Sequence, residues 1–553
     1  MRKFSSYGPV NTKLHYYAPR KELVNNACVQ LVGEIPEEGG HYITVWAPRQ
    51  TGKTWVMQQV VKKIRERGDF EIAIISMQSA KSETTAEGVL EVLTRKLWKW
   101  FDRKTEEGIL EVLARKLWKR FGRRLPETDS WKNLAELFTR KHFEKPLILI
   151  LDEFDALRED FINQFANEFR DMYISRRNEE EKPSGKKSCI LHGLALIGVR
   201  SVLGIENVSG SPFNTQRSVH IPNLTCDEVN DMFAWYQGES GQKIGQDVVE
   251  RLFYETRGQP GLTSWFGELI TEGFEDYKPE TGRPVDADDF EEVFAAAVNV
   301  LPNNNILNII SKAKQEPYNE MILDMFRTDK KIKFGFDDPD TGFLYMNGVI
   351  DREKVSRTEN YVRFSSPFVQ KRLFNYFAHD LFGYMGRVHE PFEDMSDTFV
   401  QDGLNIRSLM RRFEAHLKKN REWLLKDAPR RKDLKIFEAV WHFNLYSYLC
   451  DFLGTKYAQV WPEFPTGNGE VDLVIRYEGH VYALELKSYT DERGYREALG
   501  QAARYGRQLR LSEVSLVFFV EYIDDANREK YERDHTDEES GVLVMPMFVD
   551  TGN

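Results

Sequence analysis

The chain has 553 residues, several times the roughly 150 residues of a typical domain, so we expect several domains. Its 41% hydrophobic, 13% aromatic and 29% charged residues exclude wholesale disorder, a collagen-like repeat and a disulfide-stapled mini-protein. The net charge of -11 argues against a surface coated with nucleic-acid-binding charge, but it is compatible with a local basic channel. The four cysteines form no CxxC pair and the apolar runs are short, so we expect a reducing, cytoplasmic setting without a membrane anchor.

The first third of the sequence alternates apolar strands with helical patterns. We expect strands at residues 42–46, 71–77, 147–151 and 191–199. Near-continuous apolar strands separated by helices are typical of a parallel sheet covered on both faces. The sequence therefore predicts an α/β fold for this part of the chain.

A duplicated segment interrupts this pattern. Residues 87–103 recur as residues 107–123, with identity at thirteen of seventeen positions. Twenty residues rotate an α-helix by about 200°, so one straight helix would point the two apolar stripes in opposite directions. We therefore expect a helical hairpin that bends near Lys104. It is either a local duplication that extends a surface helix or an arm for a partner protein or homo-oligomer.

The later segments predict further domains. Residues 176–187 carry charge, Pro and Gly without an apolar period, which indicates a mobile loop. Helical patterns follow, and then strands at 342–350 and 361–364 precede a helix that begins near Pro367, which resembles a winged-helix unit. The predicted division is a P-loop ATPase core at 1–225, a helical lid at 226–300, a winged helix at 301–378, a basic helical linker at 379–432 and a C-terminal α/β domain at 433–553.

Residues 46–54, with the sequence WAPRQTGKT, lie between a predicted strand and a predicted helix at 55–67. This is the setting of a phosphate-binding loop, in which backbone N–H groups around Gly52 and the helix N-terminus face the phosphates. Lys53 would neutralise the β/γ oxygens of ATP, and Thr54 would supply a hydroxyl to Mg²⁺. Ala47 stands where the usual pattern has its first glycine, and a chance GKT in a loop is the alternative.

Two carboxylates follow the third predicted strand. Asp152 and Glu153 stand at its C-terminal end, where open α/β sheets bind ligands. Asp152 would hold Mg²⁺ through water, and Glu153 could polarise the attacking water. Arg200, at the end of the fourth predicted strand, could sense the γ-phosphate, although it could also be an ordinary surface arginine. The spacing indicates an ATPase.

Several motifs together resemble the AAA-like ATPase module of the STAND class of signal-transducing NTPases. The resemblance covers about residues 10–378 and rests on Tyr17–Arg20, Ala47–Thr54, Leu151–Asp155, Ser211–Asn214 and Gly258–Leu262. It implies that Arg200 reads the nucleotide and that the Gly258-Gln259-Pro260 motif packs near adenine. It also implies a helical lid, a winged helix and a nucleotide-controlled switch that uses ATP and Mg²⁺.

The C-terminal region contains a carboxylate–lysine pattern. Residues 469–477 and 481–487 read as two strands of a hairpin, with Asp472 on the first and Glu485 and Lys487 on the second. Two apposed carboxylates can hold a hard divalent ion, here Mg²⁺, and a neighbouring lysine can help to deprotonate a water. This chemistry suits phosphodiester hydrolysis.

The pattern resembles the PD-(D/E)xK nuclease superfamily over roughly residues 433–530, which implies a restriction-endonuclease-like α/β domain. Asp472, Glu485 and Lys487 match its Asp, Glu and Lys, and Val471 replaces the proline of its name. By the same resemblance Glu438 is the helix carboxylate, and Gln501 begins a QxxxY helix. An isolated hairpin salt bridge, in a structural or degenerate core, is the alternative.

Residues 407–432 contain ten Lys/Arg against three acidic residues. This segment is either a helix face that needs no partner or a surface that follows the phosphates of a nucleic acid. We expect an ATP-controlled, Mg²⁺-dependent nuclease that cleaves DNA rather than RNA, and the resemblance of such fusions to defence effectors implies a role in prokaryotic defence. The alternatives are a regulatory ATPase whose C-terminal domain binds nucleic acid without cutting it, and a constitutive nuclease with a structural nucleotide clamp.

Overall fold

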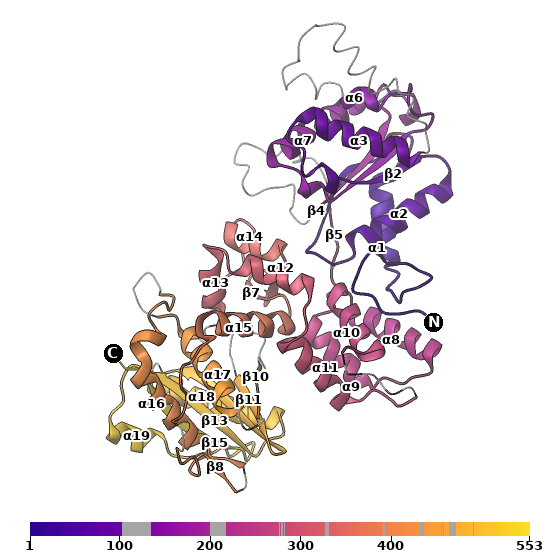
Figure 1. Ribbon diagram of the computed structural model, residues 1–553. Coiled ribbons are helices and arrows are strands. Elements are labelled where there is room, and N and C mark those ends of the chain that lie inside the picture. The colour runs from indigo at the N-terminus through magenta and orange to yellow at the C-terminus, as the bar shows by residue number, and fades with distance from the viewer. Residues whose placement is uncertain are drawn as a thin grey trace. The chain divides into compact units, whose positions relative to one another are not determined.

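The computed structural model (Figure 1) describes residues 1–101, 134–198, 217–275, 277, 280, 282–326, 331–390, 393–401, 403–430, 436–454, 456, 458–463, 472–489 and 491–552. Two compact units divide the chain. The first comprises Met1–Val293 with Met346–Gly348, and the second comprises Phe294–Tyr345 with Val349–Asn553. The finer five-part division stays a prediction.

A five-stranded parallel sheet forms the centre of the first unit. Its order is β2-β3-β4-β1-β5, with β1 at Tyr42–Trp46, β2 at Glu71–Ser76, β3 at Leu147–Asp152, β4 at Leu191–Gly198 and β5 at Arg217–His220. The prediction of the first four strands and of a parallel sheet is confirmed. The sequence analysis did not find the short edge strand β5.

Helices cover both faces of this sheet, as predicted. On the fully buried strand β3, Leu147 and Leu149 pack into one core cluster and Ile148 and Ile150 into another, because alternate side chains point to opposite faces. The helices of the sheet region are α1 (Lys21–Val32), α2 (Lys53–Arg67), α3 (Ala86–Trp100), α6 (Leu134–Leu137) and α7 (Glu159–Asn178). The helices that follow are α8 (Cys226–Ser240), α9 (Gln246–Thr256), α10 (Pro260–Glu272) and α11 (Ala287–Asn299).

The duplicated segment is described in its first copy. The first copy lies on α3, where Val92, Leu93 and Leu97 are buried in the core of the first unit. The second copy, and the predicted bend near Lys104, lie outside the described residues. The first copy is therefore a core helix, and the role of the second copy as an arm stays a prediction.

The predicted loop before β4 is confirmed for residues 179–187, but helix α7 continues to Asn178, so the loop starts later than predicted. Two of the five cations in the segment 176–187, Arg176 and Lys187, are anchored in the interior, whereas the other three are exposed. Arg176 is 4% exposed and donates to Ser184 Oγ at 2.6 Å, while Lys187 Nζ donates to the carbonyl oxygens of Glu38 and Arg176 at 2.9 and 3.0 Å. Local composition indicated solvent exposure, but these hydrogen bonds compensate the buried charge.

The second unit begins with helices and a two-stranded hairpin. Its first elements are α12 (Asn304–Ala313), α13 (Tyr318–Met325), α14 (Pro339–Met346), β6 (Ile350–Lys354), β7 (Asn360–Phe364) and α15 (Pro367–Phe382). The predicted strand at 342–350 is wrong, because residues up to Met346 belong to α14. Asp338 Oδ1 accepts from Thr341 N at 2.7 Å, which favours a helix start that the apolar run concealed.

A six-stranded mixed sheet follows. Its order is β10-β11-β12-β13-β15-β14, with β10 at Gln459–Glu463, β11 at Asp472–Tyr477, β12 at His480–Ser488, β13 at Glu513–Val520, β14 at His535–Thr536 and β15 at Leu543–Asp550. The other elements here are β8 (Phe399–Val400), β9 (Gly403–Leu404), α16 (Ile406–Leu424), α17 (Glu438–Gly454), α18 (Glu492–Gln508) and α19 (Asp525–Tyr531). Strands β12, β13 and β15 are parallel, whereas β10, β11 and β12 pair antiparallel.

Within the described ranges, no single helix has both the length and the apolar composition to cross a membrane. Helices α11 and α12, which are bent by 47° relative to each other, meet these two conditions only when they are taken together.

Candidate nucleotide site and candidate nuclease site

The candidate phosphate loop connects β1 to α2. The backbone takes positive φ angles at Gln50 (58°) and Gly52 (86°) before α2 starts. A Cβ on Gly52 would meet no atom within 4 Å, so glycine is favoured there by the backbone conformation rather than by space. Lys53 Nζ donates to the carbonyl oxygens of Ala47 and Pro48, each at 2.7 Å. Burial lowers the pKa of Lys53 to about 8, so this ammonium lacks a full solvent shell.

Thr54 and Asp152 meet across the sheet edge as the sequence predicted. Thr54 Oγ1 donates to Asp152 Oδ2 at 2.7 Å, and Asp152 is 8% exposed. Burial raises the pKa of Asp152, while the hydrogen bonds from Thr54 and from the Glu153 backbone oppose that shift. A hydroxyl and a buried carboxylate are hard oxygen ligands, so this pair fits Mg²⁺.

Glu153 stands directly after β3 with a positive φ of 55°. Its Oε2 accepts a hydrogen bond from Ser76 Oγ at 2.6 Å, and Ser76 pairs with Asp152 in the β2–β3 register. The carboxyl ends of β2 and β3 therefore bring these polar groups together at one edge of the sheet. The sequence analysis missed Ser76, which only the strand order places beside Glu153.

The Gly258-Gln259-Pro260 motif lies against the tip of the phosphate loop. Pro260 is the first residue of α10, and Gln259 Nε2 donates to the carbonyl oxygen of Arg49 at 3.0 Å. Gly258 has a φ of 67°, and a Cβ there would stand 2.1 Å from the Leu224 carbonyl oxygen. The motif thus joins the helical region to the loop. Arg200 and Ser211–Asn214 lie outside the described residues, so their roles stay predictions.

The second candidate site lies on the hairpin of β11 and β12. The strands pair antiparallel, and the register places Asp472 directly opposite Glu485. Glu485 and Lys487 are 2% and 7% exposed, and Lys487 Nζ lies 3.2 Å from Glu485 Oε1. The predicted hairpin and the shared face of Glu485 and Lys487 are confirmed. The side chain of Asp472 lies outside the described part.

Two helices flank this hairpin. Glu438 is the first residue of α17, and its side chain is also outside the described part, whereas Gln501 lies on α18. The sequence analysis missed His442, one turn after Glu438. Its ring is buried and lies 5.6 Å from the ring of Phe519. Burial, and less strongly the charge of Lys487, lower the pKa of His442 to about 3, so this imidazole is neutral near pH 7.

The N-terminal region matches a known family model. Residues 5–271 match the model of the AAA-like domain. These residues form an AAA-like P-loop ATPase domain. The match covers the phosphate loop, the Asp152–Glu153 pair and the helices up to α10, so the ATPase part of the predicted function is supported.

A search of curated proteins found no match. Solved structures with a similar fold include a Walker-type ATPase of Pyrococcus abyssi, with 13% identity, a TM-score of 0.41, and coverage of 67% of this chain and 99% of that one. ORC1 of Aeropyrum pernix in complex with DNA shows 16% identity and a TM-score of 0.31, covering 65% and 92% of the two chains. The RuvB branch migration motor of Thermotoga maritima shows 12% identity and a TM-score of 0.34, covering 62% and 92%.

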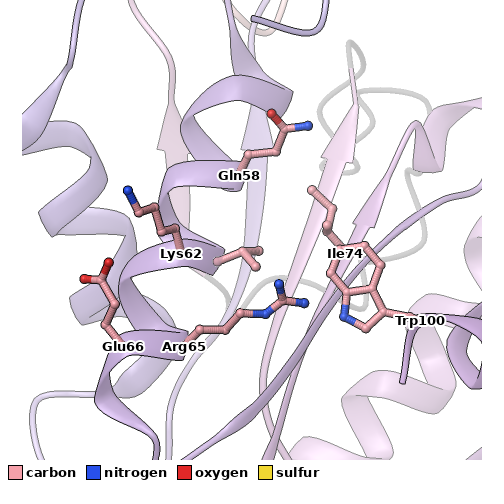
Figure 2. Close-up of a pocket in the computed structure, with 7 residues that line it drawn as sticks. Gln58, Lys62, Arg65, Glu66, Ile74 and Trp100 are labelled. Atoms are coloured by element: carbon pink, nitrogen blue, oxygen red, sulfur yellow. The ribbon is translucent and has the colours of Figure 1, made fainter. Parts of the chain in front are cut away.

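A surface pocket of about 490 Å³ lies beside the outer strand of the ATPase domain (Figure 2). Its apolar lining is Val61, Ile74 and Trp100, and its polar lining comes from α2. Arg65 reaches from α2 towards Trp100, with its guanidinium carbon 5.0 Å from the ring centroid. The sequence analysis did not find this pocket, because its residues come from three separate elements.

The cations of α16 are engaged within the second unit. Ion pairs join Arg407 to Asp534, Arg411 to Glu414 and Glu532, Arg412 to Glu393 and Asp397, Lys418 to Glu414 and Asp550, and Lys419 to Glu390. The positive charge that the sequence showed is therefore largely compensated at α16. This pattern favours a helix face that needs no partner over a surface that follows phosphates.

Glu414 is the centre of this ion-pair network. Its side chain is 10% exposed and pairs with Arg411, Lys418 and Arg528. Glu414→Ala should lower the free energy of urea unfolding by about 2–3 kcal/mol, because Arg411, Lys418 and Arg528 each lose one carboxylate partner in a partly buried network. Glu390→Ala removes only exposed pairs and should therefore lower the free energy of unfolding much less than Glu414→Ala does. Equal effects of the two substitutions would show that the network does not stabilise the fold.

Proposed function

We propose that this chain is an ATP-controlled switch that governs a Mg²⁺-dependent nuclease. The observation that carries the nuclease proposal is the β11–β12 register, which places Asp472 opposite Glu485, together with the buried Glu485–Lys487 pair. The proposed substrate is DNA and the proposed setting is prokaryotic defence; both rest on the resemblance of the sequence to STAND-class and PD-(D/E)xK proteins.

In the ATPase domain, Thr54 and Asp152 would hold Mg²⁺, and Lys53 would bind the β/γ phosphates. Bound Mg²⁺ supplies charge stabilisation for the phosphates. Glu153 would orient and polarise the attacking water, and Arg200 would sense the γ-phosphate. The 2.7 Å contact between Thr54 and Asp152 supports this assignment.

In the nuclease domain, Asp472 and Glu485 would hold a divalent ion, with Glu438 as a helix carboxylate. The bound ion supplies Lewis-acid activation of the scissile phosphate. Lys487 would orient a water and stabilise developing negative charge, and Gln501 would help to position the substrate. Glu485 fits this role because its carboxylate is buried beside an ammonium of opposite charge.

A second candidate is a regulatory ATPase whose C-terminal domain binds nucleic acid without cutting it. One observation favours it: the side chains of Lys487 and Glu485 are only 9% and 2% exposed, so their ion pair is nearly closed to solvent. A buried ion pair of this kind also occurs as a purely structural element.

One assay separates the two candidates. The full chain would be incubated with linear, circular and single-stranded DNA and with RNA, with and without ATP and Mg²⁺. Mg²⁺-dependent cleavage that changes with ATP supports the switch. Cleavage at the same rate with and without ATP supports a constitutive nuclease with a structural nucleotide clamp. Binding of nucleic acid without cleavage under every condition supports the second candidate.

Glu153→Gln tests the hydrolytic role directly. The amide keeps the shape of the side chain but is a poor base, so we expect ATP affinity within about twofold of the parent and turnover reduced at least about 100-fold. Equilibrium binding and phosphate release would measure the two effects. Unchanged turnover would remove Glu153 from the mechanism. The trapped ATP state should also change the nuclease rate if the switch exists, because a ligand shifts only states that it binds differently.

A further inference from the structure

Lys96 of α3 reaches the edge of the sheet beside the candidate catalytic glutamate. Its Nζ donates to the carbonyl oxygen of Ser76, the last residue of β2, at 2.6 Å. The hydroxyl of Ser76 donates to Glu153 Oε2, also at 2.6 Å. An ammonium, a main-chain carbonyl and a hydroxyl therefore form an unbroken series of contacts that ends on the carboxylate.

Charge links the same groups. Burial lowers the pKa of Lys96, and the negative charge of Glu153 raises it, so the two charged groups sense each other. This attraction is screened by solvent because the Glu153 side chain is exposed, so the contacts through Ser76 carry the coupling.

A rigid element carries Lys96. Trp100 lies one turn further along α3, and its Nε1 donates to the carbonyl oxygen of Ile72 at 2.9 Å. Ile72 and Ser76 both belong to β2, the outer strand of the described sheet, so α3 holds this edge at two points. Figure 2 shows Arg65 reaching towards Trp100, which further fixes the C-terminal end of α3.

The two copies of the duplicated segment differ at one of these two positions. By sequence, the second copy has Lys116 at the position of Lys96 but Arg120 at the position of Trp100. An arginine has no indole ring on which Arg65 could stack. The first copy alone therefore carries both anchoring side chain types.

We propose that Lys96 is a positioning residue for ATP hydrolysis, which holds Glu153 through Ser76 in the orientation that directs the attacking water. This inference rests on the proposed role of Glu153. It assigns a function to the first copy of the duplicated segment, because movement of α3 would reach the hydrolytic centre.

The test measures ATP turnover and ATP affinity separately in the full chain. Lys96→Met should lower kcat at least about fivefold while the Kd for ATP changes less than about twofold, because Lys96 touches neither phosphate nor metal. Lys96→Arg keeps the charge and should restore part of kcat. Lys99→Met removes an exposed cation from the same helix and should leave kcat unchanged.

Ser76→Ala should lower kcat by a similar factor, and the double variant should be little worse than either single one, because both act on the same carboxylate. A parental kcat in Lys96→Met would overturn the inference, and so would a raised kcat, which would mean that the contact holds Glu153 away from the water. If Lys96→Met unfolds, Lys96→Gln, which also removes the charge, replaces it, and a parental kcat in that variant would overturn the inference.

The failure of the proposed function can be distinguished from the failure of this inference. If Glu153→Gln hydrolyses ATP like the parent, the role of Glu153 itself is wrong. If Glu153→Gln is inactive while Lys96→Met and Ser76→Ala both turn over normally, only the positioning role of Lys96 is wrong.

Discussion

Replacing Lys53 by Ala should weaken ATP binding about 100-fold, equivalent to about 2.7 kcal/mol. Lys53 Nζ now donates to the carbonyl oxygens of Ala47 and Pro48, within the loop that faces the phosphates. Burial lowers its pKa to about 8, so the ammonium is still mostly charged near pH 7, and bound phosphates would stabilise that charge. Equilibrium titration with ATP and Mg²⁺ would measure the loss.

Lys62→Ala provides the matched control for this experiment. Lys62 lies on the same helix, α2, but lines the surface pocket shown in Figure 2. Its removal should leave ATP affinity within about twofold of the parent. If Lys53→Ala binds ATP as tightly as Lys62→Ala does, the nucleotide site is not at the loop between β1 and α2.

Glu485→Gln should abolish Mg²⁺-dependent cleavage, with a loss of at least about 1000-fold, and should leave ATP binding unchanged. The amide keeps the volume of a side chain that is 2% exposed but removes the negative charge that would hold the metal. Cleavage of linear DNA at fixed Mg²⁺ would measure the effect. Asp472→Asn, on the directly paired residue of β11, should have a similar consequence.

Folding must be measured with the Glu485 variant, because Lys487 would lose its partner in the interior. A urea unfolding curve separates lost chemistry from lost structure. Glu478→Gln, in the exposed turn of the same hairpin, is the control and should cleave like the parent. Parental cleavage by the Glu485 variant would exclude this site from catalysis.

The local patterns of this sequence predicted the central features of both sites. The apolar run 147–151 specified a buried strand, and the residues that follow it, Asp152 and Glu153, had to stand at its carboxyl end. The spacing of Asp472, Glu485 and Lys487 around a short turn specified a hairpin, because side chains alternate along each strand. These features depend on near neighbours in the sequence, which is why the pattern sufficed.

Two predictions from local patterns were not fully correct. In one, an apolar run concealed a helix signal, and in the other, charged residues suggested exposure to solvent. Residues 342–346 resemble a strand by composition, yet the cap at Asp338 and the packing of Leu344 make them part of α14. Arg176 and Lys187 resemble loop cations but are buried among hydrogen-bond acceptors. In both cases the amino-acid composition of the segment does not reveal the contacts that decide its structure.

The sequence by itself determined which residue types stand at the ends of which strands, and so the chemistry available at each site. The tertiary structure alone decided which groups from distant segments meet: Lys96 beside Ser76 and Glu153, and the cations of α16 beside Glu532 and Asp550. Strand and helix signals are short-range, whereas strand order and the burial of charge depend on the whole packed unit. The basic segment therefore predicted a charge, and the fold decided that five cations of α16 are paired with carboxylates.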